Sequence, residues 1–205
     1  MRRKPMDGPI WSGAGPNEKF VRPKSKKGEP RLRFSWNTPL VISHHNPLTF
    51  YCGANKVFKS LNRGDDWVCI SPDLTPGQRG RISTLSESPL KIGLIYVGMG
   101  RGNVQVTLND GVSWSDVSSG LPNKTINRVV ASRHELQTVY AALSGKGEDE
   151  FGAYVYMSND FGETWQSIVG NLPLESVNVI AEDPRDKDVL YTGTDLGVYA
   201  NLDRG

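Results

Sequence analysis

The chain has 205 residues, of which 37% are hydrophobic and 22% charged, with a formal net charge of +2. No run of about 18 apolar residues is present, so the composition predicts a protein without a membrane span. The charge is uneven, because residues 1–33 hold ten Lys or Arg against three Asp or Glu, whereas the rest hold fourteen against nineteen. The acidic balance of that larger part, without interleaved aromatic residues, argues against a nucleic-acid partner.

Residues 1–37 form a basic segment rich in proline and glycine, which we interpret as a solvated segment that ends in the tail of a preceding repeat unit. Arg2, Arg3 and Lys4 are typical of the start of a signal peptide. Pro5 and Asp7 follow, however, where an apolar region of about 7–15 residues would be required. We therefore predict that this chain carries no signal peptide, and the sequence leaves its cellular location open.

One eight-residue pattern, which we call the box, recurs at residues 60–67, 107–114 and 158–165, and residues 201–205 begin a fourth copy. The tryptophans of the complete copies are 47 and 51 residues apart, a period that indicates an array of β-rich units. Each complete copy has a hydroxyl residue, then Asn or Asp, Gly and Trp at fixed offsets, and the partial fourth copy has Asn, Asp and Gly in register. These residues are Ser60, Asn62, Gly64 and Trp67, then Thr107, Asn109, Gly111 and Trp114, then Ser158, Asp160, Gly162 and Trp165, and finally Asp203 and Gly205.

Three short β-rich runs precede each box, and a fourth run follows each complete box. In the first unit these runs are residues 40–43, 49–52, 57–60 and 67–70. We predict that each unit is a four-stranded antiparallel sheet, or blade. The predicted blades span residues 38–74, 75–122 and 123–173, followed by a truncated blade at 174–205.

A single blade exposes both faces and both edges, so such units gain stability by packing around an axis. We therefore predict an all-β fold, a β-propeller segment of about three and a half blades with an incomplete ring. Closure would require either the remainder of a longer polypeptide or self-association through the open blade edges.

The residue types of the box fit a structural turn. Asn or Asp accepts hydrogen bonds from nearby backbone N–H groups, and Gly permits positive φ. Trp covers a large apolar area while its indole N–H seeks a partner. We predict that each box fixes the hairpin between the third and fourth strands and takes no part in chemistry.

These boxes resemble the Asp boxes, or bacterial neuraminidase repeats, of sialidases, sortilin-type propellers, xyloglucan-cleaving hydrolases and a photosystem assembly factor. Longer phrases resemble large bacterial proteins grouped with the sortilin N-terminal domain. They lie at residues 33–39, 59–67 with 70–75, 103–106, 176–184 and 191–199. The resemblance spans about residues 33–205. It implies a fragment of a larger propeller of about seven to ten blades, with structural boxes. Full-length relatives further suggest a secreted or periplasmic location, and many are labelled glycosyl hydrolases.

If the boxes lie at one end of the sheets, the loops between second and third strands share the other end with the loops between blades. The candidate ligand-binding residues in these loops are Arg101, Asn103, Asp149, Glu150 and Asp195. Acidic runs such as residues 148–150 are also typical of solvated loops. The sequence shows no metal-ligand spacing and no cofactor motif.

A glycosidase requires two carboxyl groups about 5–5.5 Å or 6.5–9.5 Å apart. Asp149 or Glu150 with Asp195 could supply them, but no motif marks an acid or a base. Arg81 begins the phrase Arg-Ile-Ser, whereas a sialidase has Arg-Ile-Pro. We therefore predict a non-catalytic module without cofactors that binds a protein or a glycan. The alternative is part of a sialidase-like or xyloglucanase-like glycoside hydrolase whose cleft is incomplete in this chain.

The two cysteines, Cys52 and Cys69, belong to the predicted second and fourth strands of the first blade. The third strand would separate them, so we predict two buried free thiols and no disulfide.

Overall fold

The computed structural model describes residues 21–75 and 80–204. The predictions for residues 1–20 and for Gly205 lie outside the described residues. Within them the chain forms three four-stranded sheets and one three-stranded sheet, all antiparallel. The prediction of an all-β fold is therefore confirmed.

Strand order in every sheet follows chain order, so each sheet is a meander. The first sheet contains β1 (Leu40–Ile42), β2 (Phe50–Gly53), β3 (Val57–Ser60) and β4 (Val68–Cys69). The second contains β5 (Ile82–Glu87), β6 (Ile95–Met99), β7 (Val104–Thr107) and β8 (Ser115–Asp116). The third contains β9 (Thr125–Ala131), β10 (Val139–Ser144), β11 (Tyr154–Ser158) and β12 (Gln166–Ser167). The fourth contains β13 (Val177–Glu182), β14 (Leu190–Thr194) and β15 (Val198–Asn201).

Helical structure in the described residues amounts to one 3-10 turn, η1 (Lys146–Glu148), between β10 and β11. No described helix is long and apolar enough to cross a bilayer.

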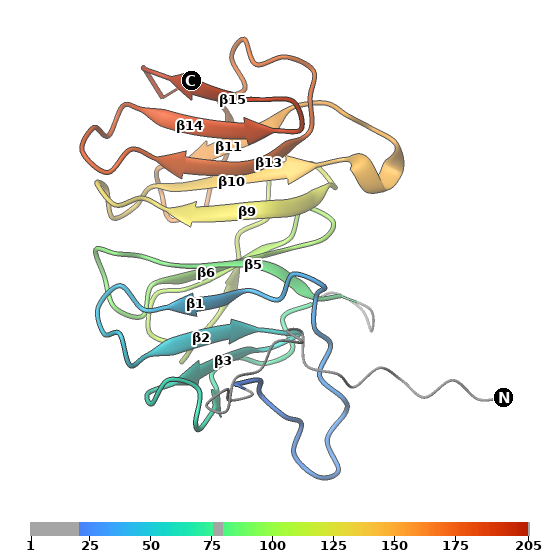
Figure 1. Cartoon of the computed structure of the whole chain (residues 1–205), viewed down its shortest axis with the longest axis vertical. Coiled ribbons are helices and arrows are strands. Elements are labelled where there is room, and N and C mark those ends of the chain that lie inside the picture. Colours follow the sequence, from blue (N-terminus) through green and yellow to red (C-terminus); the bar gives the residue numbers. More distant parts are fainter. Residues whose placement is uncertain (1–20, 76–79, 205) are drawn as a thin grey trace, which may run out of the picture.

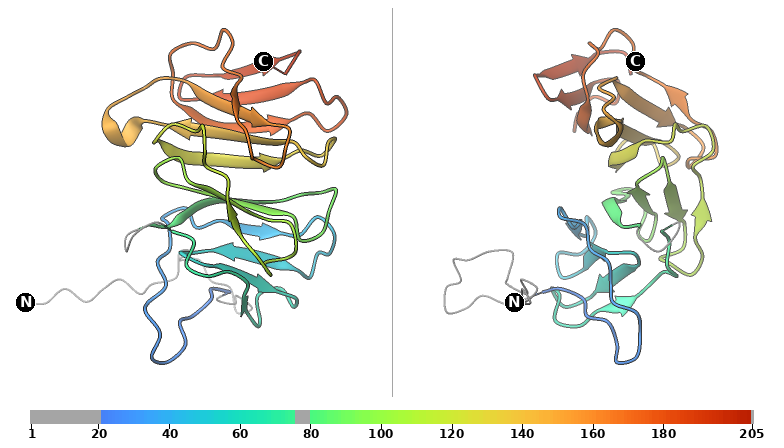
Figure 2. Two further views of the ribbon diagram at one scale, coloured as in Figure 1. Left: turned by 180° about the vertical axis from the view of Figure 1, so that it is seen from behind. Right: turned by 90° about the vertical axis from the view of Figure 1, so that its right-hand side faces the viewer.

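The four sheets stand in a row in chain order (Figure 1). The first strand of each later sheet packs against the first and second strands of the sheet before it. The row is curved, as the right-hand view of Figure 2 shows along the strands. The described sheets therefore form an open arc and do not close into a ring.

Apolar side chains fill each interface between successive sheets. Tyr51 and Ile82 belong to the cluster between the first two sheets, and Tyr96 and Ile126 belong to the next. Tyr140 and Ile180 belong to the cluster between the third and fourth sheets. Successive side chains of a strand point to opposite faces, so a blade with neighbours on both sides needs apolar residues at consecutive positions. The central strands β6 and β10, which are buried at every residue, satisfy this condition.

The two ends of the row differ. On the outer side of the first sheet, Leu32 packs against Cys52 and Phe58, and the backbone N–H of Arg33 donates to Asn55 Oδ1 at 3.0 Å. The outward face of the fourth sheet exposes apolar side chains, among them Val179, Tyr191 and Val198. The outer face of the first sheet is therefore covered by the segment around Leu32, whereas the outer face of the fourth sheet is exposed.

Buried carboxylates connect neighbouring sheets at two of the three interfaces. Glu87 accepts hydrogen bonds from Tyr51 Oη and from the His44 N–H, both at 3.0 Å. Glu182 accepts from Tyr140 Oη at 3.2 Å and from the Arg133 N–H at 2.7 Å. Each glutamate lies at the end of the first strand of its sheet, so it joins the turn and the second strand of the preceding sheet.

Both cysteines are free thiols, but the prediction that both are buried is wrong for one of them. Cys52 is buried, and that burial raises the pKa of its thiol to about 12. Cys69 is exposed because β4 is the outermost strand of its sheet. Cys52 in β2 and Cys69 in β4 both lie opposite Phe58 of β3 in the strand register, so β3 separates them.

Candidate functional site

The loops gather at two ends of the sheets. The box turns lie beside the turns that join first and second strands, since the backbone N–H groups of Arg63, Asp110 and Phe161 donate to carbonyls of those turns at 2.9 Å. We call this the box end, on the left in Figure 1. The loops between second and third strands and between sheets form the opposite end, the loop end. There the Gly102 N–H donates to the Lys124 carbonyl.

Each complete box is a turn closed by its own polar groups. Ser60 Oγ accepts from the Gly64 N–H at 2.8 Å, and Asn62 Oδ1 accepts from the Asp66 N–H at 2.9 Å. The same two bonds recur in the second and third boxes, around Thr107 and Asn109 and around Ser158 and Asp160. Gly64, Gly111 and Gly162 have φ of 86°, 89° and 97°, which glycine adopts without strain. These acceptors are used within the turn, which favours a structural role.

The tryptophans of the second and third boxes connect their sheet to the sheet before it by a hydrogen bond. The indole N–H of Trp114 donates to the carbonyl of Ile70 at 2.9 Å, and that of Trp165 donates to the carbonyl of Val117 at 2.7 Å. Trp67 belongs to the first sheet of the row, and its buried N–H has no partner among the described residues. In the fourth box, Asp203 donates its N–H to Asn201 Oδ1 at 3.0 Å.

Ion pairs join separate loops at the loop end. The Lys124 ammonium lies 2.5 Å from a Glu148 carboxylate oxygen and also pairs with Glu150. Hydrogen bonds to these two carboxylates raise the pKa of Lys124. The loop before β9 is thereby joined to the loop between β10 and β11.

A second cluster joins the third and fourth sheets. Lys146 forms an ion pair with Asp195, and Asn178 Nδ2 donates to the same carboxylate at 2.9 Å. The hydrogen bond from Lys146, followed by that from Asn178, lowers the pKa of Asp195. This carboxylate is therefore ionised at neutral pH.

The remaining predicted site residues have different environments. Asn103 Nδ2 donates to Asp116 Oδ2 at 3.0 Å and to Ser118 Oγ at 3.1 Å, so it ties its loop to β8. Arg101 and Asp149 are exposed, and both have a left-handed backbone. All five predicted residues lie at the loop end, but their side chains do not converge on one shared contact.

Sequence reasoning selected the acidic residues but did not predict the ion pairs that they form with Lys124 and Lys146. Lys124 is 24 and 26 residues away from its partners, and Lys146 is 49 residues away from Asp195. The signal for these pairs was their common position at the loop end, where Lys124 meets another loop of its own sheet and Lys146 meets a loop of the next sheet. Among the described residues, no group of three or more His, Cys, Asp and Glu side chains is placed to hold a metal ion.

No family model matches the chain, and no curated protein matches its sequence. Solved structures do match. An ancestral GH74 enzyme is 19% identical with a TM-score of 0.68, and the match covers 86% of this chain and 24% of that one. The GH74 enzyme of Niastella koreensis is 20% identical with a TM-score of 0.65, over 81% of this chain and 28% of that one. YCF48 bound to D1 peptide is 12% identical with a TM-score of 0.52, over 83% of this chain and 57% of that one.

These similarities establish the fold alone, because the identities are low. The chain has the β-propeller fold of the GH74 enzymes and YCF48, and it spans about a quarter of the length of the matched GH74 enzymes. The predicted propeller segment is confirmed.

Proposed function

We propose that this chain is a non-catalytic β-propeller module that binds a protein or glycan through its loop end, and that its boxes are structural Asp boxes. The observation that carries this proposal is the pairing of the two best-placed candidate carboxylates, Glu150 and Asp195, with lysines of the same surface.

A glycosidase acid must hold a proton near neutral pH, which requires a carboxyl group with a raised pKa. Asp195 has the opposite property, because Lys146 and Asn178 lower its pKa. Glu150 contributes its charge to the ion pair with Lys124. These contacts favour a surface that presents fixed charges to a partner over one that transfers protons.

The loop end offers groups that suit recognition. The exposed side chains of Arg101 and Asp149 can contact a ligand, and rigid strands hold the loops that carry them. YCF48 has been solved bound to D1 peptide, so at least one propeller of this fold binds a peptide. This likeness supports the binding proposal and identifies no ligand for this chain.

The second candidate is part of a glycoside hydrolase. It is favoured by the similarity to GH74 enzymes, and it would use Asp149 or Glu150 together with Asp195. In this case the chain would hold part of a cleft that other blades complete.

Glycan and peptide arrays probed with the purified chain test the proposal. We expect a specific signal that falls about tenfold when Arg101 is changed to Ala, because arginine contacts often contribute more than 1 kcal/mol at an interface. The matched control is Arg63→Ala, since Arg63 is also exposed and left-handed but belongs to a box. The chain should also leave xyloglucan and sialosides intact. Sugar release that disappears in Asp195→Asn would instead establish the hydrolase.

A further inference from the structure

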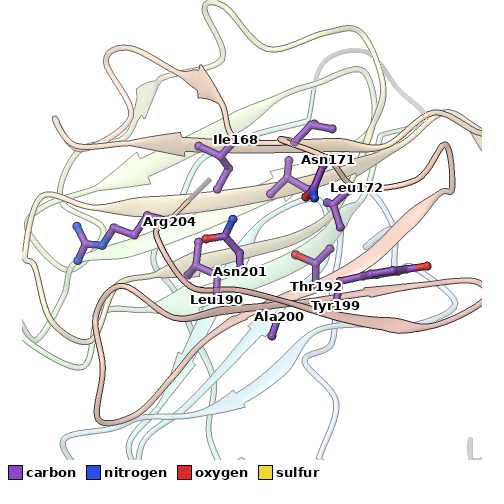
Figure 3. A pocket seen from close by; sticks show the side chains of 11 residues that line it. Ile168, Asn171, Leu172, Leu190, Thr192, Tyr199, Ala200, Asn201 and Arg204 are labelled. Atoms are coloured by element: carbon purple, nitrogen blue, oxygen red, sulfur yellow. The ribbon is translucent and has the colours of Figure 1, made fainter.

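A cavity of about 320 Å³ lies between the third and fourth sheets. Figure 3 shows its walls, which come from both sheets. Ile168 and Leu172 follow β12 in the third sheet, and Leu190, Thr192 and Tyr199 belong to β14 and β15. The candidate residues of the loop end do not line it, so this cavity is separate from the proposed ligand surface.

At the two preceding interfaces, a box tryptophan packs at the equivalent position. Trp114 packs on the cluster that includes Ile70 and Leu74, three and seven residues after the preceding box tryptophan. Trp165 packs in the same way on the cluster of Val117 and Leu121. The equivalent residues of the next interface are Ile168 and Leu172, and both line the cavity. We call these equivalent positions between successive sheets sockets. The cavity is the third socket, and the first two hold the indole rings of Trp114 and Trp165.

The hydrogen-bond acceptor for an indole is placed in the same way. Trp114 donates to the carbonyl of Ile70, and Trp165 donates to the carbonyl of Val117. The equivalent carbonyl is that of Ile168, a residue of the cavity wall. A tryptophan in this socket would therefore have both an apolar wall and an acceptor.

β15 is the third strand of its sheet and corresponds to β3, β7 and β11 of the other sheets. In each of those sheets a fourth strand pairs with the third strand, and the residue three positions after the box tryptophan donates its N–H to the carbonyl of a valine in the third strand. These bonds join Ile70 to Val57, Val117 to Val104 and Ile168 to Val155, at 2.9 to 3.0 Å. Val198 holds the same register in the fourth sheet, opposite Gly193. No fourth strand pairs with β15 among the described residues.

We propose that this cavity and the edge of β15 form an acceptor for an extended peptide segment that carries Trp-Xaa-Xaa-Ile or Trp-Xaa-Xaa-Val. The segment would add as the fourth strand of the last sheet by β-augmentation. Its indole would fill the cavity and donate to the Ile168 carbonyl, and its Ile or Val N–H would donate to the Val198 carbonyl. This site lies outside the loop end and does not depend on the proposed ligand-binding function.

A second copy of the chain does not fit this description of the occupant. The three segments of this sequence with the required pattern are residues 67–70, 114–117 and 165–168. All three are already paired within their own sheets. The occupant is therefore a segment of polypeptide other than residues 1–205 of a folded copy.

A fluorescent peptide with the sequence of residues 162–169, titrated with the purified chain, tests the proposal by anisotropy. We expect saturable binding, and at least about tenfold weaker binding for the peptide with Trp165→Ala, because a buried tryptophan is a dominant anchor of such interfaces. In the protein, Leu172→Asp should weaken binding to a similar extent, since it places a charge in the cavity wall. The matched control is Leu174→Asp, because Leu174 is 88% exposed two residues further along and does not line the cavity.

Equal affinity of the tryptophan and alanine peptides would overturn the proposal, and so would equal binding by the Leu172→Asp and Leu174→Asp proteins. A dimer in sedimentation velocity that excludes the peptide would also overturn it, because a second copy would then occupy the socket. Near-ultraviolet circular dichroism reports whether Leu172→Asp folds. If it does not fold, the comparison of the two peptides on the unaltered chain decides the question.

Discussion

Single buried groups decide how well neighbouring sheets are joined. Tyr51, Tyr96 and Tyr140 occupy the same position of the second strand in three successive sheets, and all are at most 1% exposed. Tyr51 and Tyr140 donate to a glutamate of the next sheet. The hydroxyl of Tyr96 is buried without a partner among the described residues, because the next sheet has Ala131 in place of that glutamate.

This difference predicts opposite effects of the same substitution. Tyr51→Phe should destabilise the chain by about 1–3 kcal/mol, because it removes a hydrogen bond and leaves the buried Glu87 with fewer donors. Tyr96→Phe should be neutral or stabilising by up to about 1 kcal/mol, because it removes a buried hydroxyl that lacks a partner. Urea unfolding of the two variants measures the difference, and equal losses of stability would contradict this account.

At the same scale, the sequence identified the candidate residues of the loop end but not their chemistry. Asp149, Glu150 and Asp195 were selected as acids in exposed loops, and the loop positions depend only on the order of the strands. The ion pair of Asp195 with Lys146 depends on how the third and fourth sheets are turned against each other, and that of Glu150 with Lys124 depends on how two loops of the third sheet lie against each other. Sequence spacing carries no measure of either arrangement.

Among the elements, the box hairpin is the most regular. The three complete boxes make the same pair of hydrogen bonds from backbone N–H groups to side-chain oxygens, although two of them carry Asn and the third carries Asp160. The hydrogen bonds from Thr164 Oγ, Ser158 Oγ and the Thr164 N–H lower the pKa of Asp160 to about 2. The turn therefore stabilises the negative charge of Asp160, but the same hydrogen bonds form with the uncharged Asn62 and Asn109.

A pH-dependent comparison tests the role of this element. The folded-state pKa of Asp160 is below the unfolded-state value of about 3.9, so its contribution to stability is complete above that value and is lost as pH falls toward 2. Asp160→Asn should keep the acceptor for the Thr164 N–H, as Asn62 and Asn109 do, and should lose part of this acid sensitivity. Asp160→Ala should cost about 1 kcal/mol at pH 7, because it removes the acceptor.

Thermal unfolding of the three proteins at pH 7 and pH 3 provides the measurement. A large loss of stability in Asp160→Asn at pH 7 would show that the charge itself, and not the acceptor, maintains the turn.

For the whole molecule, the open arc has consequences for solution behaviour. The outward face of the fourth sheet exposes Val179, Tyr191 and Val198 at 40%, 38% and 77%, and these residues lie on the face opposite the cavity. Contiguous exposed apolar surface and unpaired strand edges favour association.

We therefore expect the purified chain to self-associate as its concentration rises. Val179→Lys should reduce this association, because it places a charge on the bare face. Val112→Lys should not, because Val112 is 86% exposed in a box turn of the second sheet, away from that face. Sedimentation velocity over a range of concentrations measures both effects. A chain that stays monomeric throughout would show that the bare face is too small or too polar at its rim to drive association.

The sequence alone determined the strands, their order and the box turns, because alternating apolar residues, turn formers and the spacing of the tryptophans are local properties of the chain. It also determined which loops share an end, since that follows from strand count. The tertiary structure decided which lysine pairs with which carboxylate, which tyrosine lacks a partner and which indole socket is empty. The Lys146–Asp195 pair, the tyrosine contacts and the socket depend on the packing of one sheet against the next, which joins residues of blades that repeat about every 40–50 residues. The Lys124 pairs depend on how two loops of the third blade lie against each other.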